Sequence, residues 1–104
     1  MQLELSRPAV IDLAGHQRWI ASEVGLDVAD RMLAAANRAF ARLVDMPGLG
    51  SPVEISSPEL EGLRKWRIEG FPNLRIFYMP RDELLVVARV LHTAQNWSAL
   101  LDGA

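Results

Sequence analysis

The C-terminal half of the chain contains three short apolar segments at close intervals, and this pattern constrains the fold more than any other feature. The segments are Leu63–Ile68, Leu74–Met79 and Leu84–Leu91. Each is rich in aliphatic, β-branched or aromatic residues and has the length of a strand. Only a few residues, including Pro72 and Pro80, separate one segment from the next. Connections this short join antiparallel neighbours, so the three segments are predicted to form an antiparallel meander.

The N-terminal half has a different hydrophobic period. Residues 2–6 alternate between apolar and polar side chains, which predicts a short strand with one buried face. Pro8 suits the first turn of a helix, because a backbone N–H at that position has no helical partner in any case. This helix is predicted to run to Ser22 or Val24 and to stop at Gly25. Its inward line is predicted from apolar residues at helical spacing: Val10, Leu13, Ile20 and Val24.

A second helix follows at once, so the two helices are predicted to form a tight hairpin. Asp27 is predicted to cap it, and Asp30 places a second carboxylate near the positive end of the helix dipole. The turn-forming run Met46–Pro52 ends the helix. The connection over residues 48–62 has no clear period, and a long connection in a small domain is often functional. The apolar stripe of this helix is predicted to comprise Ala29, Met32, Leu33, Ala36, Phe40 and Leu43.

The order of the predicted elements defines a fold class. One strand, two helices and three strands give an α+β fold, in which a small antiparallel sheet packs against the N-terminal helical hairpin. The hairpin is expected to cover one sheet face and to leave the other free. Asn96–Leu101 is predicted to form a last helical turn, with Trp97, Leu100 and Leu101 returning to the core. The 104 residues fit a single domain spanning residues 1–104.

Composition removes several classes of site. The sequence has no cysteine, which excludes disulfides, thiolate nucleophiles and sulfur-ligated zinc. The two histidines, His16 and His92, are far apart in the chain, and neither a metal nor another cofactor is predicted. The longest apolar runs are far below the roughly 18 to 20 residues that a membrane span needs, and the first residues do not resemble a signal peptide. A cytoplasmic protein without a membrane partner is therefore expected.

The net charge of −2 conceals an uneven distribution. Residues 1–62 carry five Arg against nine acidic residues, whereas residues 63–104 carry six Arg or Lys against four. Cations in the C-terminal half favour anionic partners, while the acidic residues elsewhere oppose non-specific binding to nucleic acid. Direct, sequence-specific nucleic-acid binding by this chain alone is not expected.

Five stretches of the sequence resemble the ParE branch of the RelE/ParE toxin–antitoxin superfamily, in matching order and spacing. They are Leu5–Ala9, Ala29–Leu33, Met46–Pro52, Leu63–Arg64 with Phe71–Tyr78, and Arg89–Asn96. The last stretch is the most specific of the five. The resemblance covers nearly the whole chain and implies the same β-α-α-β-β-β layout. It also implies a toxin of a type II pair that is neutralised by a cognate antitoxin, with growth arrest and plasmid stabilization as the expected biology.

The resemblance leaves two chemistries open. RelE-like relatives cleave mRNA on the ribosome, whereas ParE-like relatives inhibit DNA gyrase and have no hydrolytic site. RNA cleavage through the 2′-oxygen needs a base, an acid and cations on the developing charge. Candidates for such a site are Arg64, Lys65, Arg75, Arg89 and His92. Tyr78 lies inside an apolar strand, and no tyrosine follows the last strand, where RelE-like nucleases commonly carry one. Gyrase inhibition is therefore favoured over ribosome-dependent cleavage.

Two sets of residues are predicted to bind the partners that the resemblance implies. The set predicted to bind the target, for which the resemblance implies DNA gyrase, consists of Arg64, Lys65, Arg67, Arg75, Arg89, His92, Asn96 and Trp97. An antitoxin segment, implied to be acidic and apolar, is predicted to contact Trp19, Arg75 and Tyr78. Trp and Arg concentrate at binding hot spots, which favours Trp19 for this role. Packing of Trp19 within the fold is the alternative.

Several candidates also have a purely structural interpretation. Arg75 and Arg89 lie on adjacent predicted strands and form either one anion-binding patch or separate surface ion pairs. Trp66 could hold single-stranded nucleic acid by stacking, although a place in the core is favoured. His92 shares its period with buried strand residues, and ParE-like relatives carry a histidine there without catalysis, so a structural role is favoured. His16 is predicted to be solvated.

One departure from the family pattern concerns Gln95. Many ParE-like relatives carry arginine at this position, and an arginine supplies a cation that glutamine lacks. Together with the acidic net charge, Gln95 leaves open a third alternative. This alternative is a detoxified member that binds its partners without poisoning a target.

Overall fold

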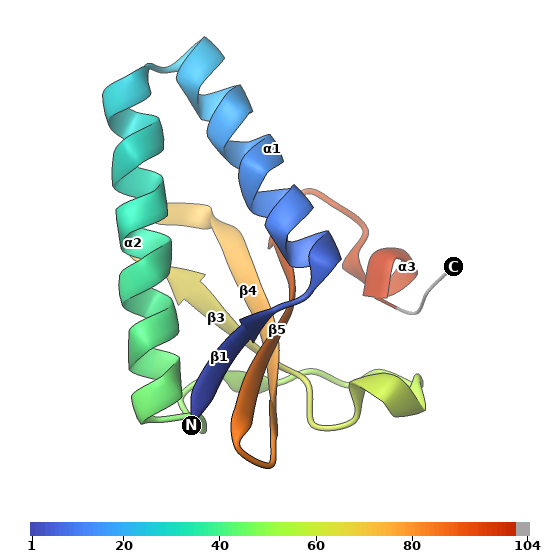
Figure 1. Cartoon of the computed structure of the whole chain (residues 1–104). Helices are drawn as coiled ribbons and strands as arrows, with labels where there is room; N and C mark the ends of the chain where they lie inside the picture. Colours follow the sequence, from blue (N-terminus) through green and yellow to red (C-terminus); the bar gives the residue numbers. More distant parts are fainter. Residues whose placement is uncertain (102–104) are drawn as a thin grey trace.

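The computed structural model describes residues 1–101, and its elements follow the predicted order with one short strand added. Figure 1 shows a helical hairpin splayed over one face of a twisted sheet. The elements are β1 (Gln2–Leu5), α1 (Arg7–Glu23), α2 (Leu26–Asp45), β2 (Ser51–Pro52), the 3₁₀ turn η1 (Pro58–Leu60), β3 (Arg64–Ile68), β4 (Phe71–Arg81), β5 (Leu84–His92) and α3 (Trp97–Leu101). The α+β class and the hairpin-on-sheet arrangement are therefore confirmed.

The sheet has five strands in the order β1-β5-β4-β3-β2. Strands β3, β4 and β5 form the predicted antiparallel meander. The prediction of an all-antiparallel sheet is wrong for β1, which pairs parallel to β5 with Gln2 opposite Leu84. The two helices carry the chain from β1 at one edge of the sheet to β2 at the opposite edge. The meander then crosses back, so its last strand, β5, lies beside β1. The extra strand β2 comes from the turn-rich run after α2 and pairs with β3.

Helix α1 is anchored to the sheet by Ser6, the residue that caps its N-terminus. The Ser6 hydroxyl accepts a hydrogen bond from the Ala9 amide at 3.2 Å and donates one to the Ala88 carbonyl of β5 at 2.7 Å. The predicted inward line is wrong at two of its four positions, since Val10 is 52% exposed and Val24 60% exposed. The helix crosses the sheet on a neighbouring line instead, and that line buries Ala9 and Ile20.

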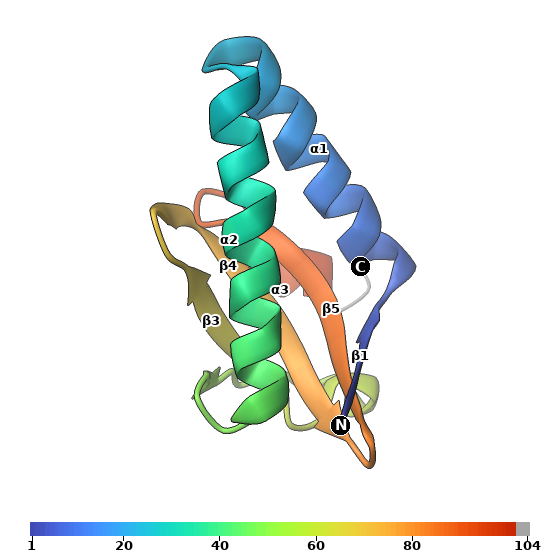
Figure 2. The same ribbon diagram turned by 60° about the vertical axis from the view of Figure 1, so that its left-hand side comes forward.

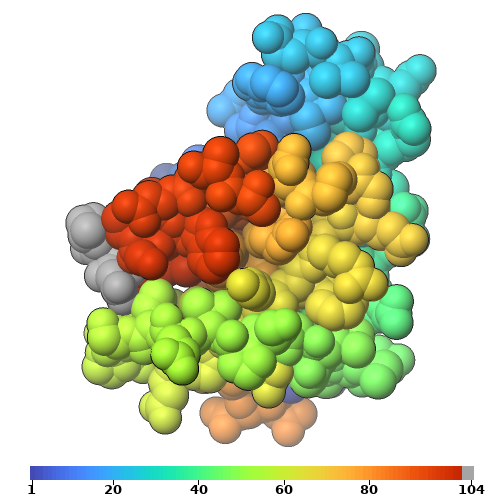
Figure 3. Space-filling model, turned by 180° about the vertical axis from the view of Figure 1, so that it is seen from behind, coloured from blue at the N-terminus to red at the C-terminus, as the bar shows by residue number. Residues whose placement is uncertain are grey.

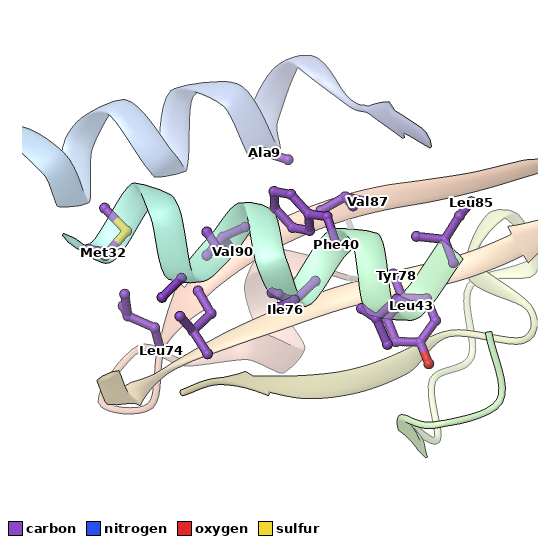
Figure 4. Close-up of a cluster of buried hydrophobic side chains, with 14 of the residues drawn as sticks. Ala9, Met32, Phe40, Leu43, Leu74, Ile76, Tyr78, Leu85, Val87 and Val90 are labelled. Carbon is purple, nitrogen blue, oxygen red and sulfur yellow. The ribbon is translucent and has the colours of Figure 1, made fainter. Parts of the chain in front are cut away.

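Helix α2 supplies most of the main core. The predicted cap at Asp27 is wrong, because the helix begins at Leu26 and Gly25 occupies the capping position with a φ of 144°. That φ lies in a region that residues with a side chain rarely adopt. The predicted stripe is confirmed except at Leu33, which is half-buried. Figure 4 shows side chains of this stripe, including Phe40, packed against side chains of β4 and β5.

The second face of the sheet is not free, contrary to the prediction. A second core lies there and consists of Leu63, Phe77, Met79, Leu91 and Leu101. Residues 53–60 and α3 cover it, and Figure 3 shows both segments lying over this face. Leu101 returns to the core as predicted, but Leu100 points outward and is 39% exposed. The long connection, which had no period in the sequence, therefore has a packing role.

Candidate functional site: two surfaces and a set of internal clamps

Tyr78 and Arg64 together hold the loop that follows α2. The Tyr78 hydroxyl donates to the Pro47 carbonyl at 2.6 Å and accepts from the Gly50 amide at 2.8 Å. The Arg64 guanidinium donates to the Gly50 carbonyl at 2.5 Å from the same side of the sheet. These bonds satisfy backbone groups that would otherwise be buried without partners. Arg64 therefore stabilises the loop through its guanidinium. This structural role explains the arginine at position 64 without a contact to a target.

Tyr78 is fully buried, with an exposed fraction of 0%. An antitoxin cannot contact such a side chain without unfolding the loop above it, so its burial argues against the predicted antitoxin contact. Burial also raises the pKa of Tyr78, because the phenolate is disfavoured away from water, and the hydrogen bond from Gly50 and the charge of Arg64 oppose this effect. The raised pKa makes Tyr78 a poor proton acceptor for catalysis near neutral pH.

We expect the raised pKa of Tyr78 to make the protein sensitive to alkali. The folded state holds the phenolic proton more tightly than the unfolded chain, whose tyrosine has the usual value of 10.0. This contribution to stability is complete below about pH 10 and is lost as the pH rises above it. The Tyr78→Phe variant should be less stable at pH 7 by about 1–3 kcal/mol, because Pro47 and Gly50 lose their partner.

The measurement is urea unfolding at several pH values from neutral to strongly alkaline. The wild-type protein should lose more stability than Tyr78→Phe above about pH 10. Parallel pH profiles for the two proteins would contradict the assignment of the alkaline loss to Tyr78.

Arg89 is locked into an ion pair with Asp12 of α1. Its Nε donates to one carboxylate oxygen at 2.8 Å and its Nη2 to the other at 2.9 Å, so the pair is bidentate. The Val90 amide donates to the same carboxylate at 3.0 Å. These hydrogen bonds to Asp12 raise the pKa of Arg89. The register of β4 and β5 shifts next to Arg89.

Arg75 lies apart from Arg89. It sits opposite Arg67 of β3, and its guanidinium donates to the carbonyls of Pro72 and Leu74 at 2.6 and 3.0 Å. The predicted alternative of one anion-binding patch formed by Arg75 and Arg89 is therefore wrong. The sequence leaves this alternative open because Asp12, the partner of Arg89, lies 77 positions away in the chain.

Lys65, Trp97 and Asn96 organise the C-terminal turn. The Lys65 ammonium lies 4.8 Å from the centre of the Trp97 ring, and that ring packs against Phe77 with centroids 5.3 Å apart. Asn96 accepts from the Ala99 amide at 3.4 Å through its side chain. Lys65 and Trp97 remain half-buried and Asn96 is exposed, so all three keep accessible surface beside α3. This group is one part of the predicted target-binding set that shares a place, and Arg67 with Arg75 is another.

His92 and Gln95 stabilise the turn that follows β5. Gln95 accepts a hydrogen bond from the His92 amide at 2.7 Å through its side-chain oxygen. The His92 Nδ1 accepts from the Ala94 amide at 3.0 Å. An imidazole whose Nδ1 accepts from the backbone carries its proton on Nε2, so its orientation is fixed by the turn. Gln95 thus has a local structural function in this turn.

An apolar groove lies between the tip of the helical hairpin and the turn between β3 and β4. Its volume is about 250 Å³, and it is lined from the helices by His16, Trp19, Ile20, Val24 and Val28 and from the sheet by residues 70–74 and His92. Trp19 is 63% exposed, which excludes the alternative that it packs inside the fold. We call this site the Trp19 groove. It is a concave apolar surface of the kind that receives side chains of a binding partner.

The prediction that His16 is solvated is wrong. Its Nε2 lies 2.8 Å from the Val90 carbonyl, which can only accept, so Nε2 donates and the side chain is half-buried. Together with the Asp12 contact to Val90, this bond holds α1 on β5. Asp12 itself was missed as a partner of Arg89. The available signal was its place between Ile11 and Leu13, where an isolated acidic side chain on a helix that packs on a sheet needs a cation.

Trp66 is half-buried against the main core, so the favoured core interpretation is partly right. The Arg67 guanidinium lies 4.5 Å from the centre of its ring. Within residues 1–101, no group of three or more His, Asp or Glu residues is placed to hold a metal ion. No helix in the same part of the chain has both the length and the apolar character needed to cross a membrane.

Solved structures define the class of this fold. The chain is similar to a chain from a chromosomal ParDE TA system from P. aeruginosa, with a TM-score of 0.74, 19% identity and coverage of 88% of this chain and 95% of that one. It is also similar to a chain of a YoeB-YefM complex from Staphylococcus aureus, with a TM-score of 0.54, 16% identity and coverage of 88% and 95%. The fold is therefore that of ParE/RelE-type toxins.

The family follows from the sequence itself. The profile of the family described as ParE toxin of type II toxin-antitoxin system, parDE, matches residues 3–97. The chain therefore belongs to the ParE toxin family of type II toxin–antitoxin systems. No curated protein sequence matches it.

Proposed function

We propose that this toxin acts by inhibiting DNA gyrase in the cytoplasm and does not cleave RNA. The observation that carries the proposal is that two of the five candidate groups for RNA cleavage, and the one tyrosine of the chain, are committed to the fold. Arg64 holds a loop, Arg89 is paired with Asp12, and Tyr78 is buried. Developing charge on a phosphate needs donors that are aimed at it, and groups already bonded elsewhere cannot supply them without rearrangement.

The remaining candidates for a nuclease are Lys65, Arg75 and His92. The Lys65 ammonium lies over Trp97 on one sheet face, whereas His92 lines the Trp19 groove on the helical side. A general base and the cation that assists it must reach the same phosphate group, so this separation disfavours a common site. The RelE-type ribosome-dependent nuclease remains the second candidate because the fold is also similar to a chain of a YoeB-YefM complex.

We place the antitoxin contact at the Trp19 groove. Its lining is mainly apolar, and the exposed Trp19 stands at its edge with the half-buried Phe71 on the opposite side. Apolar side chains of an antitoxin would fill the groove and remove this surface from water. Of the three residues predicted for antitoxin binding, Trp19 has the surface that this role requires. Arg75 is half-buried and does not line the groove, but lines a neighbouring hollow that shares Gly70 and Pro72 with it.

Expression in a bacterial host tests the proposed function. The chain is produced alone and together with the protein encoded beside it, while growth, gyrase-dependent DNA breaks and mRNA integrity are followed. We expect growth arrest with DNA breaks and intact mRNA, and recovery when the neighbour is present. Arrest with cleaved mRNA and intact chromosomes would favour the nuclease instead. Harmless expression alone would favour a detoxified, binding-only member.

The Trp19→Glu variant should separate toxicity from neutralisation. A carboxylate at the edge of an apolar groove disfavours burial of a partner's side chains, and loss of a central hot-spot Trp costs about 2 kcal/mol or more in binding. That cost corresponds to roughly 30-fold weaker antitoxin binding by calorimetry. The fold should persist because Trp19 is 63% exposed.

Val10→Glu is the matched control, since Val10 is 52% exposed on the same helix but does not line the groove. It should bind the antitoxin as tightly as the wild-type protein does. Unchanged antitoxin affinity in Trp19→Glu, or equal loss in both variants, would place the antitoxin elsewhere.

A further inference from the structure

Both histidines of the chain line the Trp19 groove. His16 reaches it from α1, and His92 reaches it from the end of β5. Among the described residues, no other side chain in the lining is ionisable. Histidine is the side chain whose charge commonly changes between pH 5 and 8. The charges that this lining can acquire on mild acidification therefore lie on the two imidazoles.

The hydrogen bonds of His92 require a neutral ring. Its Nδ1 accepts from the Ala94 amide at 3.0 Å, so a proton on Nδ1 would set two donors against each other. The Thr93 amide in the same turn donates to the carbonyl of Asn73, a lining residue, at 2.7 Å. Figure 2 shows this turn beside the β3–β4 turn, under the helical hairpin. Charging His92 therefore adds a cation to the groove and breaks a bond in its wall.

His16 keeps its structural bond in either charge state. Its Nε2 donates to the Val90 carbonyl at 2.8 Å, and this bond needs only the proton on Nε2. Within residues 1–101, the other ring nitrogen, Nδ1, has no hydrogen-bond partner. Nδ1 is therefore the atom of His16 that takes up a proton. Charging His16 adds a second cation to the groove and leaves α1 in place.

The charged side chains that approach the groove from the surrounding elements lie outside its lining. They are Asp12 on α1, Arg31 on α2, Glu69 in the β3–β4 turn, Arg75 on β4 and Arg89 on β5. Asp12 and Arg89 neutralise each other in their ion pair. Arg75 binds carbonyls of lining residues, whereas Arg31 and Glu69 line an adjoining hollow. Among the described residues, the groove itself thus contains no carboxylate that could compensate a charged imidazole.

We propose that the Trp19 groove is a proton-controlled binding site, which releases its partner when His16 and His92 become charged. In the free protein both side chains are half-buried and retain contact with water. An apolar segment that covers the groove removes this water, and an imidazolium without water or a counter-charge is strongly disfavoured. Binding therefore holds both rings neutral and releases protons, so the affinity falls as the pH falls.

The inference rests on the proposed function in one respect, because the partner is the antitoxin assigned to this groove. The sign of the linkage follows from the free and bound states. The free toxin takes up protons as the pH falls, and the complex does not. Acidification therefore stabilises the free toxin relative to the complex, and a fall in the pH around the complex would liberate the toxin.

Calorimetric titration of the full chain with its antitoxin, at about pH 7.5 and at about pH 5.5, tests the release. We expect at least about tenfold weaker binding at the lower pH, because an affinity linked to one proton changes by up to tenfold per pH unit. Titrations near pH 6 in buffers of different ionisation enthalpy should show a net release of protons on binding. Proton uptake, or an affinity independent of pH, would overturn the inference.

A double variant, His16→Gln with His92→Asn, separates these histidines from titrating groups of the antitoxin. The Gln amide can donate to the Val90 carbonyl, and the Asn oxygen can accept from the Ala94 amide, so both bonds are kept without a titrating ring. The loss of affinity on acidification should be at least about fivefold smaller in this variant than in the wild type. Equal losses in the two proteins would assign the pH dependence to the antitoxin and overturn the inference.

Nitrogen NMR of the isotope-labelled toxin alone gives a result that needs no antitoxin. Near neutral pH both rings should carry their proton on Nε2. At about pH 5.5 both should carry two protons, and the Ala94 amide should lose its bond to His92. Rings that stay neutral at the lower pH would overturn the switch. Unchanged antitoxin affinity in Trp19→Glu would instead reject the antitoxin as the partner, and with it the release, although the rings would still titrate.

Discussion

Asp12→Ala is expected to lower the free energy of unfolding by about 2–3 kcal/mol. The side chains of Asp12 and Arg89 are only 11% and 21% exposed, so removal of the carboxylate leaves a largely covered guanidinium without its counter-charge. The Val90 amide loses its acceptor at the same time. For a domain of this size such a change lowers the melting temperature by about 10–20 °C, which differential scanning calorimetry measures directly.

A double-mutant cycle identifies the ion pair as the cause. Arg89→Met removes the cation and keeps a long apolar stem, so adding it to Asp12→Ala should recover part of the lost stability. Asp12→Asn retains an oxygen for the Val90 amide and should cost less than Asp12→Ala. Glu61→Ala, an exposed acid on the long connection, should change stability by less than about 0.5 kcal/mol. Equal losses in Asp12→Ala and Glu61→Ala would contradict this account of α1 docking.

Gly50→Ala is expected to destabilise the fold by about 2–3 kcal/mol. A Cβ at this position would lie 2.6 Å from the Tyr78 hydroxyl and 2.7 Å from the Lys65 carbonyl oxygen. Neither neighbour can retreat easily, because Tyr78 is buried and Lys65 contributes backbone of β3. The clash would also separate Tyr78 from the Pro47 carbonyl and the Gly50 amide, which it now satisfies.

Gly48→Ala is the matched control for this position. A Cβ there would have no heavy atom within 4 Å, so the substitution should be neutral or slightly stabilising through the unfolded state. Chemical denaturation of both variants gives the comparison. Adding Tyr78→Phe to Gly50→Ala should restore part of the loss, since it removes one of the clashing atoms. Equal stabilities of the Gly48 and Gly50 variants would show that the loop is not held as described.

The strands and helices could be predicted from the sequence because their apolar periods agree with the way they pack. The apolar residues of α2 repeat at helical spacing and pack against the sheet. The residues that the spacing selects are therefore the residues that are buried. Helix α1 buries fewer residues than α2 does. Its apolar residues Val10 and Val24 are exposed, so their helical spacing predicted the wrong packing face. The parallel pairing of β1 with β5 could not be derived from local pattern, because it joins the first strand to the last.

Side-chain contacts could not be predicted from the sequence where they depend on a distant partner. One patch formed by Arg75 and Arg89 was an open alternative, but the carboxylate of Asp12 on α1 binds Arg89 instead. His16 has no local signal for its bond to Val90, which lies across the fold. The sequence left open whether Trp19 is exposed or packed within the fold, because the exposed side of a helix is known only once its packing face is known. In the structure Trp19 is exposed.

The hydrogen bond of Gln95 gives this residue a structural role at the position where the family resemblance implies an arginine. Gln95 caps the His92 amide and so preserves the turn after β5 without the cation that many relatives carry there. Lys65, Asn96 and Trp97 remain accessible beside this turn.

A cleavage assay with purified gyrase, supercoiled plasmid and this protein tests gyrase inhibition most directly. We expect the protein to convert plasmid into gyrase-linked linear DNA, and we expect prior incubation with the antitoxin to abolish this conversion. The same preparation should leave mRNA intact on translating ribosomes. Absence of linear DNA at an excess of active protein, together with cleavage of the ribosome-bound mRNA, would contradict gyrase inhibition and identify a nuclease.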